Sequence, residues 1–133
     1  MLNIRESGSG CKWSMVGDMI VKHINWDMDT RWFTTYKKLR KYEPRLIEVY
    51  EYRDRKIYME FIEGELLRDT ITLNGYLEVC DILKNIGIFC VDNNITFINH
   101  ATHLRNFMVE NGTEKIYMID PDSFMVYDEN SSS

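Results

Sequence analysis

The sequence predicts a small α+β domain, in which an antiparallel sheet carries one helix and is followed by a second helix and a hairpin. Short strand-like segments separated by glycine turns fill the first 24 residues and return at residues 46–62. A helical stripe of apolar residues lies between them and ends at Pro44. Two apolar segments flank Asn111-Gly112, which is typical of a hairpin. With 133 residues, 44% of them hydrophobic, the chain is long enough for one modest core.

Composition excludes several classes of protein. The formal net charge of −5 argues against nucleic acid as a partner. No apolar run is long enough to span a membrane, and the N-terminus lacks the apolar segment of a signal peptide. The three cysteines lack metal-site spacing and indicate reduced thiols. We therefore expect a cytoplasmic protein with no membrane partner, in which residues 1–127 form one domain and residues 128–133 a flexible tail.

The first third of the chain predicts a hairpin and a helix. Strands are expected at Cys11–Val16 and Met19–Ile24, joined by a tight glycine-aspartate turn. A helix is expected over Trp26–Tyr42, with Asp27 or Asp29 as its cap. This helix lies on one face of the predicted sheet.

The middle of the chain predicts a second hairpin and a second helix. The strands are expected at Leu46–Tyr52 and Lys56–Ile62. The helix is expected over Asn74–Asn85, with Asn74 as its cap and Gly87 as the residue that ends or bends it. We expect this helix to lie under the C-terminal hairpin.

The C-terminal hairpin carries the clearest chemical signal. Its strands, Phe107–Val109 and Ile116–Ile119, place Asn106 just before the first strand and Asp120 just after the second. A hairpin holds these two ends side by side, so an amide oxygen and a carboxylate meet there. Mg²⁺ prefers such oxygen ligands, with phosphate and water completing its shell. Asp122, two residues on, is a candidate for an additional ligand or a capping bond.

The hairpin and the loop before it resemble the catalytic core of the protein-kinase-like superfamily, which includes the aminoglycoside phosphotransferases. In that family a loop H-x-D-x-x-x-x-N leads into a hairpin that ends in a metal-binding Asp. Asn106 matches the loop Asn and Asp120 the metal Asp, whereas Ala101 stands in place of the catalytic Asp. The resemblance implies a minimal kinase-like fold, with an N-lobe-type antiparallel sheet and one helix plus a truncated C-lobe.

The N-terminal segment G-S-G-C-K-W resembles a degraded form of the family's glycine-rich loop. Gly8 and Gly10 match the first two glycines of this loop, and Trp13 replaces the third. Lys22 matches the strand lysine that contacts the nucleotide phosphates. The family's helix carries a Glu that pairs with this lysine, but no Glu lies between Ile24 and Tyr42. We therefore expect Lys22 either to pair with another acid, such as Asp120, or to remain unpaired.

The segment Y-M-E-F-I-E-G resembles the hinge between the two kinase lobes. By this resemblance the main chain at Glu60 and Ile62 pairs with the edge of adenine, and Met59 guards the back of the pocket. Gly64 is expected to supply the turn out of the hinge. The implied ligands are Mg²⁺ and ATP or ADP.

Three functions remain open from the sequence. The first is a pseudokinase-type protein that binds Mg-nucleotide weakly or not at all and acts by contacting another protein. The second is a small ATP-dependent phosphotransferase in which His100 or His103 replaces the missing base. The third is an α+β domain whose likeness to kinases is accidental. A transition-metal site is a further alternative, built from the two histidines with Asp120 and Asp122.

Overall fold

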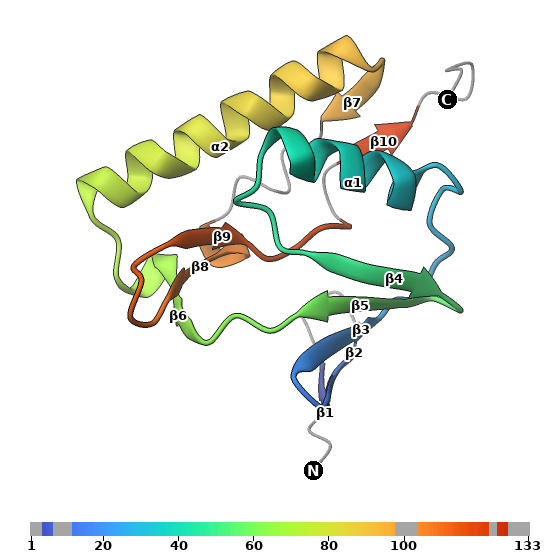
Figure 1. The fold of residues 1–133 in the computed structure, drawn as a ribbon, viewed down its shortest axis with the longest axis horizontal. Coiled ribbons are helices and arrows are strands. Elements are labelled where there is room, and N and C mark those ends of the chain that lie inside the picture. The colour runs from blue at the N-terminus through green and yellow to red at the C-terminus, as the bar shows by residue number, and fades with distance from the viewer. Residues whose placement is uncertain (1–3, 7–11, 98–103, 123–124, 128–133) are drawn as a thin grey trace.

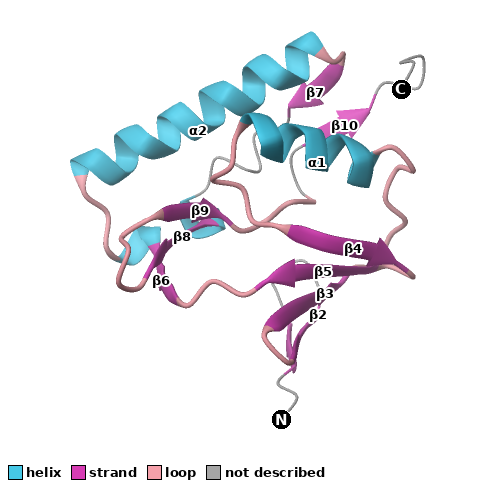
Figure 2. Ribbon diagram, in the orientation of Figure 1, coloured by secondary structure: helices cyan, strands magenta, loops and turns pink. Residues whose placement is uncertain are grey.

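A computed structural model of the chain describes residues 4–6, 12–97, 104–122 and 125–127. Within these residues, two α-helices and three small sheets form layers (Figures 1 and 2). The N-terminal sheet lies at one side, helix α1 crosses the middle, and helix α2 runs along the opposite edge. None of the helices in the described ranges is both long and apolar enough to cross a membrane.

The largest sheet is antiparallel and has five strands in the order β1-β2-β3-β5-β4. Two-residue turns close the β2–β3 and β4–β5 hairpins. Gly17 adopts a positive φ of 62°, and Asp54 and Arg55 have φ values of 51° and 60°. Such turns match the right-handed twist of paired strands. The strands are β1 (Ile4–Glu6), β2 (Lys12–Val16), β3 (Met19–His23), β4 (Val49–Arg53) and β5 (Lys56–Glu60).

Helix α1 spans Trp32–Tyr42, so the prediction that it begins at Trp26 was wrong. The residues before it form turns instead. The Asp29 carboxylate accepts hydrogen bonds from the backbone N–H of Arg31 at 2.8 Å and from its guanidinium. Asp27 forms an ion pair with Arg55 at the β4–β5 turn. Because aspartate side chains bond to nearby backbone and to other elements here, the helix starts later.

Helix α2 spans Leu73–Asp92 and is longer than predicted. Its cap is Thr72, not Asn74: the Thr72 hydroxyl accepts a hydrogen bond from the backbone N–H of Gly75 at 3.0 Å. Gly87 does not end the helix. Phe89 and Cys90 beyond it are buried in the core, and that burial outweighs the roughly 1 kcal/mol that glycine costs inside a helix.

A second sheet contains the predicted C-terminal hairpin. Its strand order is β6-β8-β9, with β6 at Gly64–Leu66, β8 at Phe107–Glu110 and β9 at Ile116–Met118. The connection over residues 111–115 is longer than the predicted two-residue turn, and Glu114 as well as Gly112 adopts a positive φ. A separate pair joins β7 (Ile95–Phe97) to β10 (Met125–Tyr127).

Gly64 has a different role from the predicted turn out of the hinge. It lies within β6, opposite Glu110 of β8. A Cβ at this position would lie 1.9 Å from the carbonyl oxygen of Val109. Only glycine therefore allows the two strands to approach this closely.

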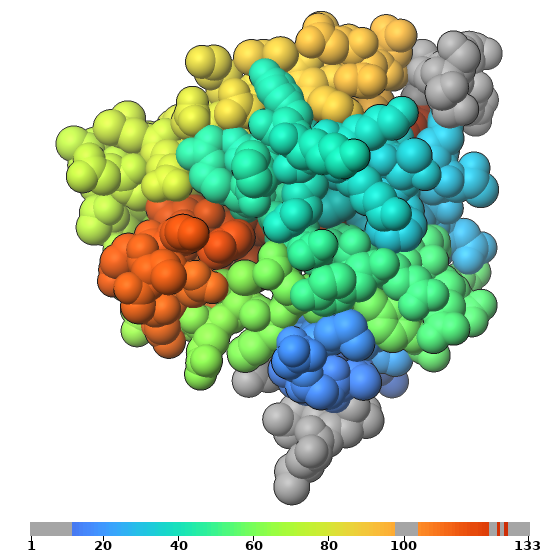
Figure 3. Space-filling model, viewed as in Figure 1, coloured from blue at the N-terminus to red at the C-terminus, as the bar shows by residue number. Residues whose placement is uncertain are grey.

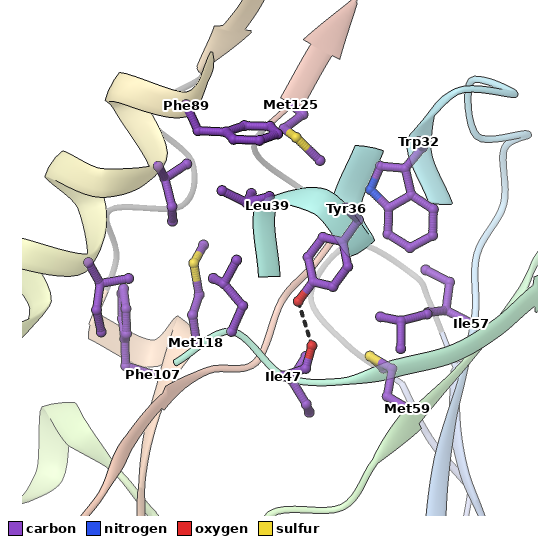
Figure 4. Close-up of a cluster of buried hydrophobic side chains, with 14 of the residues drawn as sticks. Trp32, Tyr36, Leu39, Ile47, Ile57, Met59, Phe89, Phe107, Met118 and Met125 are labelled. Carbon is purple, nitrogen blue, oxygen red and sulfur yellow. Dashed lines mark hydrogen bonds between the residues drawn. The ribbon is translucent and has the colours of Figure 1, made fainter. Parts of the chain in front are cut away.

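The segment between α1 and β4 ties the N-terminal sheet to the C-terminal hairpin. Leu46 was predicted to begin a strand of the second hairpin, but it forms a parallel bridge to Met118 of β9 instead. The N–H of Ile47 donates to the carbonyl of Met118 at 3.0 Å. The buried Tyr36 hydroxyl donates to the carbonyl of Ile47 at 2.6 Å (Figure 4). One continuous core therefore joins residues from both halves of the chain.

Candidate functional site

The strand lysine and the hairpin aspartates meet in one buried ion cluster. Lys22, from β3, places its Nζ 2.9 Å from Asp120 Oδ1. The same Nζ lies 2.9 Å and 3.1 Å from the two carboxylate oxygens of Asp122. The side chains of Lys22 and Asp122 are only 5% and 2% exposed, whereas that of Asp120 is 23% exposed. Of the two alternatives, a Lys22 that pairs with another acid such as Asp120 and a Lys22 that stays unpaired, the structure shows the first, and Asp122 is a second partner.

The aspartates are held in place by the elements around them. The N–H of Ile119 donates to the carbonyl of Asn106 at 2.8 Å, so the chain brings Asn106 beside Asp120. Asn106 is itself buried. On the other side, the indole N–H of Trp32 in α1 donates to the carbonyl of Pro121 at 3.2 Å. Helix α1 therefore contacts the site through Pro121, which lies between the two aspartates, although the helix has no glutamate to pair with Lys22.

The charges in this cluster do not balance, because two carboxylates face one ammonium group. Burial, and next the charge of Asp120, raises the pKa of Asp122 to about 7, against the opposing pull of Lys22. Burial alone would lower the pKa of Lys22, but the charges of Asp122 and Asp120 outweigh it and raise that pKa. The cluster thus holds a strongly retained ammonium group and a carboxyl group that titrates near neutral pH.

Trp13 lies over the lysine. It faces Lys22 across the β2–β3 pair, and the Lys22 Nζ lies 5.1 Å from the centre of its ring. This distance fits a cation–π contact. Trp13 was predicted to stand where the family has the third loop glycine, and in the structure it covers one side of the ammonium group.

Of the predicted hinge residues, Met59 and Glu60 form the end of β5, and Ile62 follows it. Met59 is fully buried and Ile62 nearly so. The N–H of Glu60 donates to the carbonyl of Glu48 at 3.0 Å, and its carboxylate accepts from the N–H of Glu48. A base docked here would have to use other main-chain groups.

Several predicted site residues lie outside the described residues. They are Gly8, Gly10, Ala101, His100 and His103. Within the described parts of the chain, no group of three or more His, Cys, Asp or Glu side chains is arranged to hold a metal ion. The metal alternative that combines the histidines with Asp120 and Asp122 therefore stays a prediction.

Asp122 is the residue whose role the sequence analysis missed. It was predicted only as an additional ligand or cap, but its carboxylate is the buried anchor of Lys22. Two signals in the sequence were available: the absence of a glutamate from α1, and the second carboxylate in I-D-P-D. Together they show that the lysine needs an acid from another element.

No protein-family model matches the chain, and no curated protein matches it in sequence. Among solved structures, the kinase PK-1 of Cydia pomonella granulovirus is similar, with a TM-score of 0.54 and 15% sequence identity over 92% of this chain. The chain has a protein-kinase-like fold. It covers 52% of the PK-1 chain, so it spans about half the length of that kinase.

Proposed function

We propose that this protein is a reduced, pseudokinase-type protein that binds Mg-nucleotide weakly or not at all and acts by contacting another protein. The observation that carries the proposal is the double pairing of Lys22 with Asp120 and Asp122. The groups that a kinase-like protein uses for phosphate and metal are bonded to each other here. The replacement of the catalytic aspartate by Ala101 points the same way.

The residues of the site have the right donor chemistry for a nucleotide. Asn106 and Asp120 would hold Mg²⁺ through oxygen atoms, and the metal would supply positive charge to the phosphates. Lys22 would contact phosphate as a point charge. Adenine would lie against the segment from Met59 to Ile62, in which the side chains of Met59 and Ile62 are themselves buried in the core.

Competition within the site argues that binding is weak. Phosphate must compete with two carboxylates for Lys22, and Mg²⁺ must compete with Lys22 for Asp120. Trp13 covers the ammonium group from another side. Removing one buried partner from an ion pair leaves an uncompensated charge, so opening this cluster is costly.

Thermal unfolding with ATP, ADP and GTP, with and without Mg²⁺, tests the proposal. We expect a small shift, or none, at millimolar nucleotide. Asp122→Asn leaves Lys22 only one charged partner, and we expect it to increase the shift. Asp69→Asn is a matched control, because Asp69 is an exposed aspartate of the short 3-10 helix Leu67–Asp69, outside the site.

A strong response of the unaltered protein would contradict the proposal. A hundredfold excess of ligand over its dissociation constant adds roughly 2.7 kcal/mol of stability, which is a shift of several degrees for a domain of this size. A shift of that size at micromolar Mg-ATP means that the cluster opens readily and that the site is a working nucleotide site.

A phosphotransfer assay separates the pseudokinase from the phosphotransferase alternative. We expect very slow turnover or none, because losing a general base commonly costs about 10²- to 10⁴-fold in rate. Ala101→Asp restores a carboxylate at that position and is expected to raise ATP hydrolysis if nucleotide binds. Robust turnover that His100→Ala abolishes would instead support the phosphotransferase.

A further inference from the structure

Helix α2 has an apolar stripe on the face that points away from the core. Leu73 is 73% exposed, Leu77 55%, Ile88 40% and Val91 76%. Cys80 is also exposed. These five residues, which we call the α2 stripe, run along all 20 residues of the helix. Figure 1 shows that the other elements lie on one side of α2, and in the space-filling view of Figure 3 it forms one edge of the molecule.

The spacing of the stripe is that of a helix–helix seam. The positions are separated by four, three, eight and three residues, with Lys84 in the middle of the longest gap. Steps of three and four residues keep side chains in a narrow line on one face of a helix. The core-facing residues of α2, such as Ile82 and Ile86, lie on the opposite face. Packing within the chain therefore does not explain the stripe, and such a narrow line is typical of a coiled-coil seam.

We propose that the α2 stripe is a dimer interface, in which the α2 helices of two copies of this chain pack antiparallel about a two-fold axis that crosses the stripe midway between Cys80 and Lys84. In this register Leu73 faces Val91 of the second copy, and Cys80 faces its Lys84. Leu77 faces Ile88 and the adjoining Gly87 of the second copy, where the missing side chain leaves room. Each of these layers occurs twice, as a two-fold interface requires.

Charge selects both the orientation and the second copy as the occupant. A parallel pair would place the two Lys84 side chains against each other in the seam, where like charges destabilise. In the antiparallel pair each Lys84 lies beside Asp81 of the other copy. Asp81 is an exposed carboxylate on the flank of the stripe, and Arg45 holds it at 2.8 Å. The helix thus supplies its own complementary charge.

The inferred interface is small. Twenty helical residues extend about 30 Å, and one helix pair buries less surface than a standard interface. We therefore expect a dimer with a micromolar dissociation constant, which forms at high concentration and dissociates on dilution. The inference rests on the proposed function in one respect: it identifies the contacted protein as a second copy of this chain. The nucleotide site plays no part in it, so the two can fail separately.

Sedimentation of the full chain over about 1 to 500 μM tests the dimer. We expect a shift from monomer to dimer across this range, and we expect Leu77→Glu to weaken dimerisation at least about tenfold, because it places a carboxylate in the seam. Tyr50→Glu is the matched control: Tyr50 is 49% exposed on β4, away from α2, and its substitution should leave the dimer intact. Thermal unfolding of dilute samples checks that both variants fold. A protein that stays monomeric throughout, or a dimer that Leu77→Glu leaves unchanged, would overturn the inference.

Disulfide formation tests the orientation. The double variant Cys80→Ser/Lys84→Cys, mixed with the unaltered protein under mild oxidation, should give a cross-linked dimer that neither protein gives alone, because Cys80 faces position 84 only in the antiparallel pair. Cross-linking of the double variant by itself would show that two position-84 side chains meet. That result would overturn the antiparallel arrangement.

Discussion

Glu43 and Asp122 are both buried carboxylates, but their surroundings differ. Glu43, just after α1, accepts hydrogen bonds from the backbone N–H and the guanidinium of Arg45 and from the side-chain amide of Asn85. Burial alone would raise the pKa of Glu43, but the bonds from Arg45 and Asn85 outweigh it and lower that pKa. Asp122 shares one ammonium group with Asp120, and its pKa is raised to about 7.

This difference in pKa distinguishes the cluster of Glu43 and Arg45, which is structural, from the cluster of Lys22, Asp120 and Asp122, which is the candidate functional site. The hydrogen bonds from Arg45 and Asn85 satisfy the buried carboxylate of Glu43. The other acids that pair with Arg45, Glu78 and Asp81, reach solvent. At Lys22 two carboxylates, one buried and one partly exposed, face a single cation, so the cluster carries excess negative charge once Asp122 is ionised. Excess buried charge is costly to fold around, and it is often found where a protein binds ions or transfers protons.

The largest effect is expected from removing the cation of the unbalanced cluster. Lys22→Met leaves the buried carboxylate of Asp122 beside that of Asp120 without a positive charge, and we expect it to lower the free energy of unfolding by about 3 kcal/mol at pH 8. The loss should shrink at pH 5, where Asp122 carries a proton. Urea denaturation at the two pH values measures this. An equal loss at both would show that repulsion between the carboxylates is not the cause.

Glu43→Gln is the corresponding change in the saturated cluster. It removes charge-assisted hydrogen bonds from Arg45, and we expect a loss of about 2 kcal/mol. Because the folded-state pKa of Glu43 is lowered, its contribution is present above its ordinary pKa and is lost only as pH falls below that value. The loss should therefore be the same at pH 6 and pH 8. A stability loss that differs strongly between pH 6 and pH 8 would show that Glu43 titrates in the same range as Asp122.

Asp122→Asn is expected to stabilise the protein by about 1 kcal/mol at pH 8. The folded protein holds a proton on Asp122 that the unfolded chain has lost between about pH 4 and pH 7. Stability of the unaltered protein should therefore fall as pH rises through that range, by up to about 1.4 kcal/mol per pH unit. The variant should show a flatter profile by thermal unfolding. A profile unchanged by the substitution would mean that another group titrates there.

The smallest effect on stability is expected from replacing Trp13, whose ring lies against the ammonium group of Lys22. Trp13→Leu keeps apolar surface but removes the ring from Lys22, and we expect a loss of about 0.5–1 kcal/mol. In a Lys22→Met background the same substitution should cost less. A double-mutant cycle measures that difference, and strict additivity would show that the ring and the ammonium group do not interact.

The sequence predicted the main elements and the meeting of Lys22 with Asp120. The prediction of the elements rests on local patterns, because turn residues set the hairpins and a hairpin must hold its two ends together. The meeting of Lys22 with Asp120 was one of two alternatives that followed from the resemblance to kinases and from the absence of a Glu between Ile24 and Tyr42. The predicted boundaries of α1 and α2 were wrong where side-chain hydrogen bonds outweighed the local preference of the chain for helix. Asp29 bonds to the backbone before α1, and Thr72 caps α2 one turn before its first buried positions.

The sequence indicated that Lys22 needs an acid from another element, but it did not identify Asp122 as that acid, because nothing local fixes the direction of a carboxylate after a proline in a loop. Its position depends on the carbonyl of Pro121, which Trp32 holds from a helix 89 residues earlier in the chain. In the sequence Trp32 is one member of an apolar stripe, and its indole N–H gives no sign of a partner. Such contacts appear only when distant elements are placed together.

The bridge between Leu46 and Met118 has a consequence for the order of folding. The carboxylates that neutralise Lys22 follow it in the chain by 98 and 100 residues. At a synthesis rate of about 5–20 residues per second, β3 with Lys22 is synthesised roughly 5–20 s before Asp120 and Asp122. During this interval the edge formed by residues 45–47 also lacks β9. The N-terminal sheet is therefore expected to stay open to chaperones or other strands until the last hairpin closes over it.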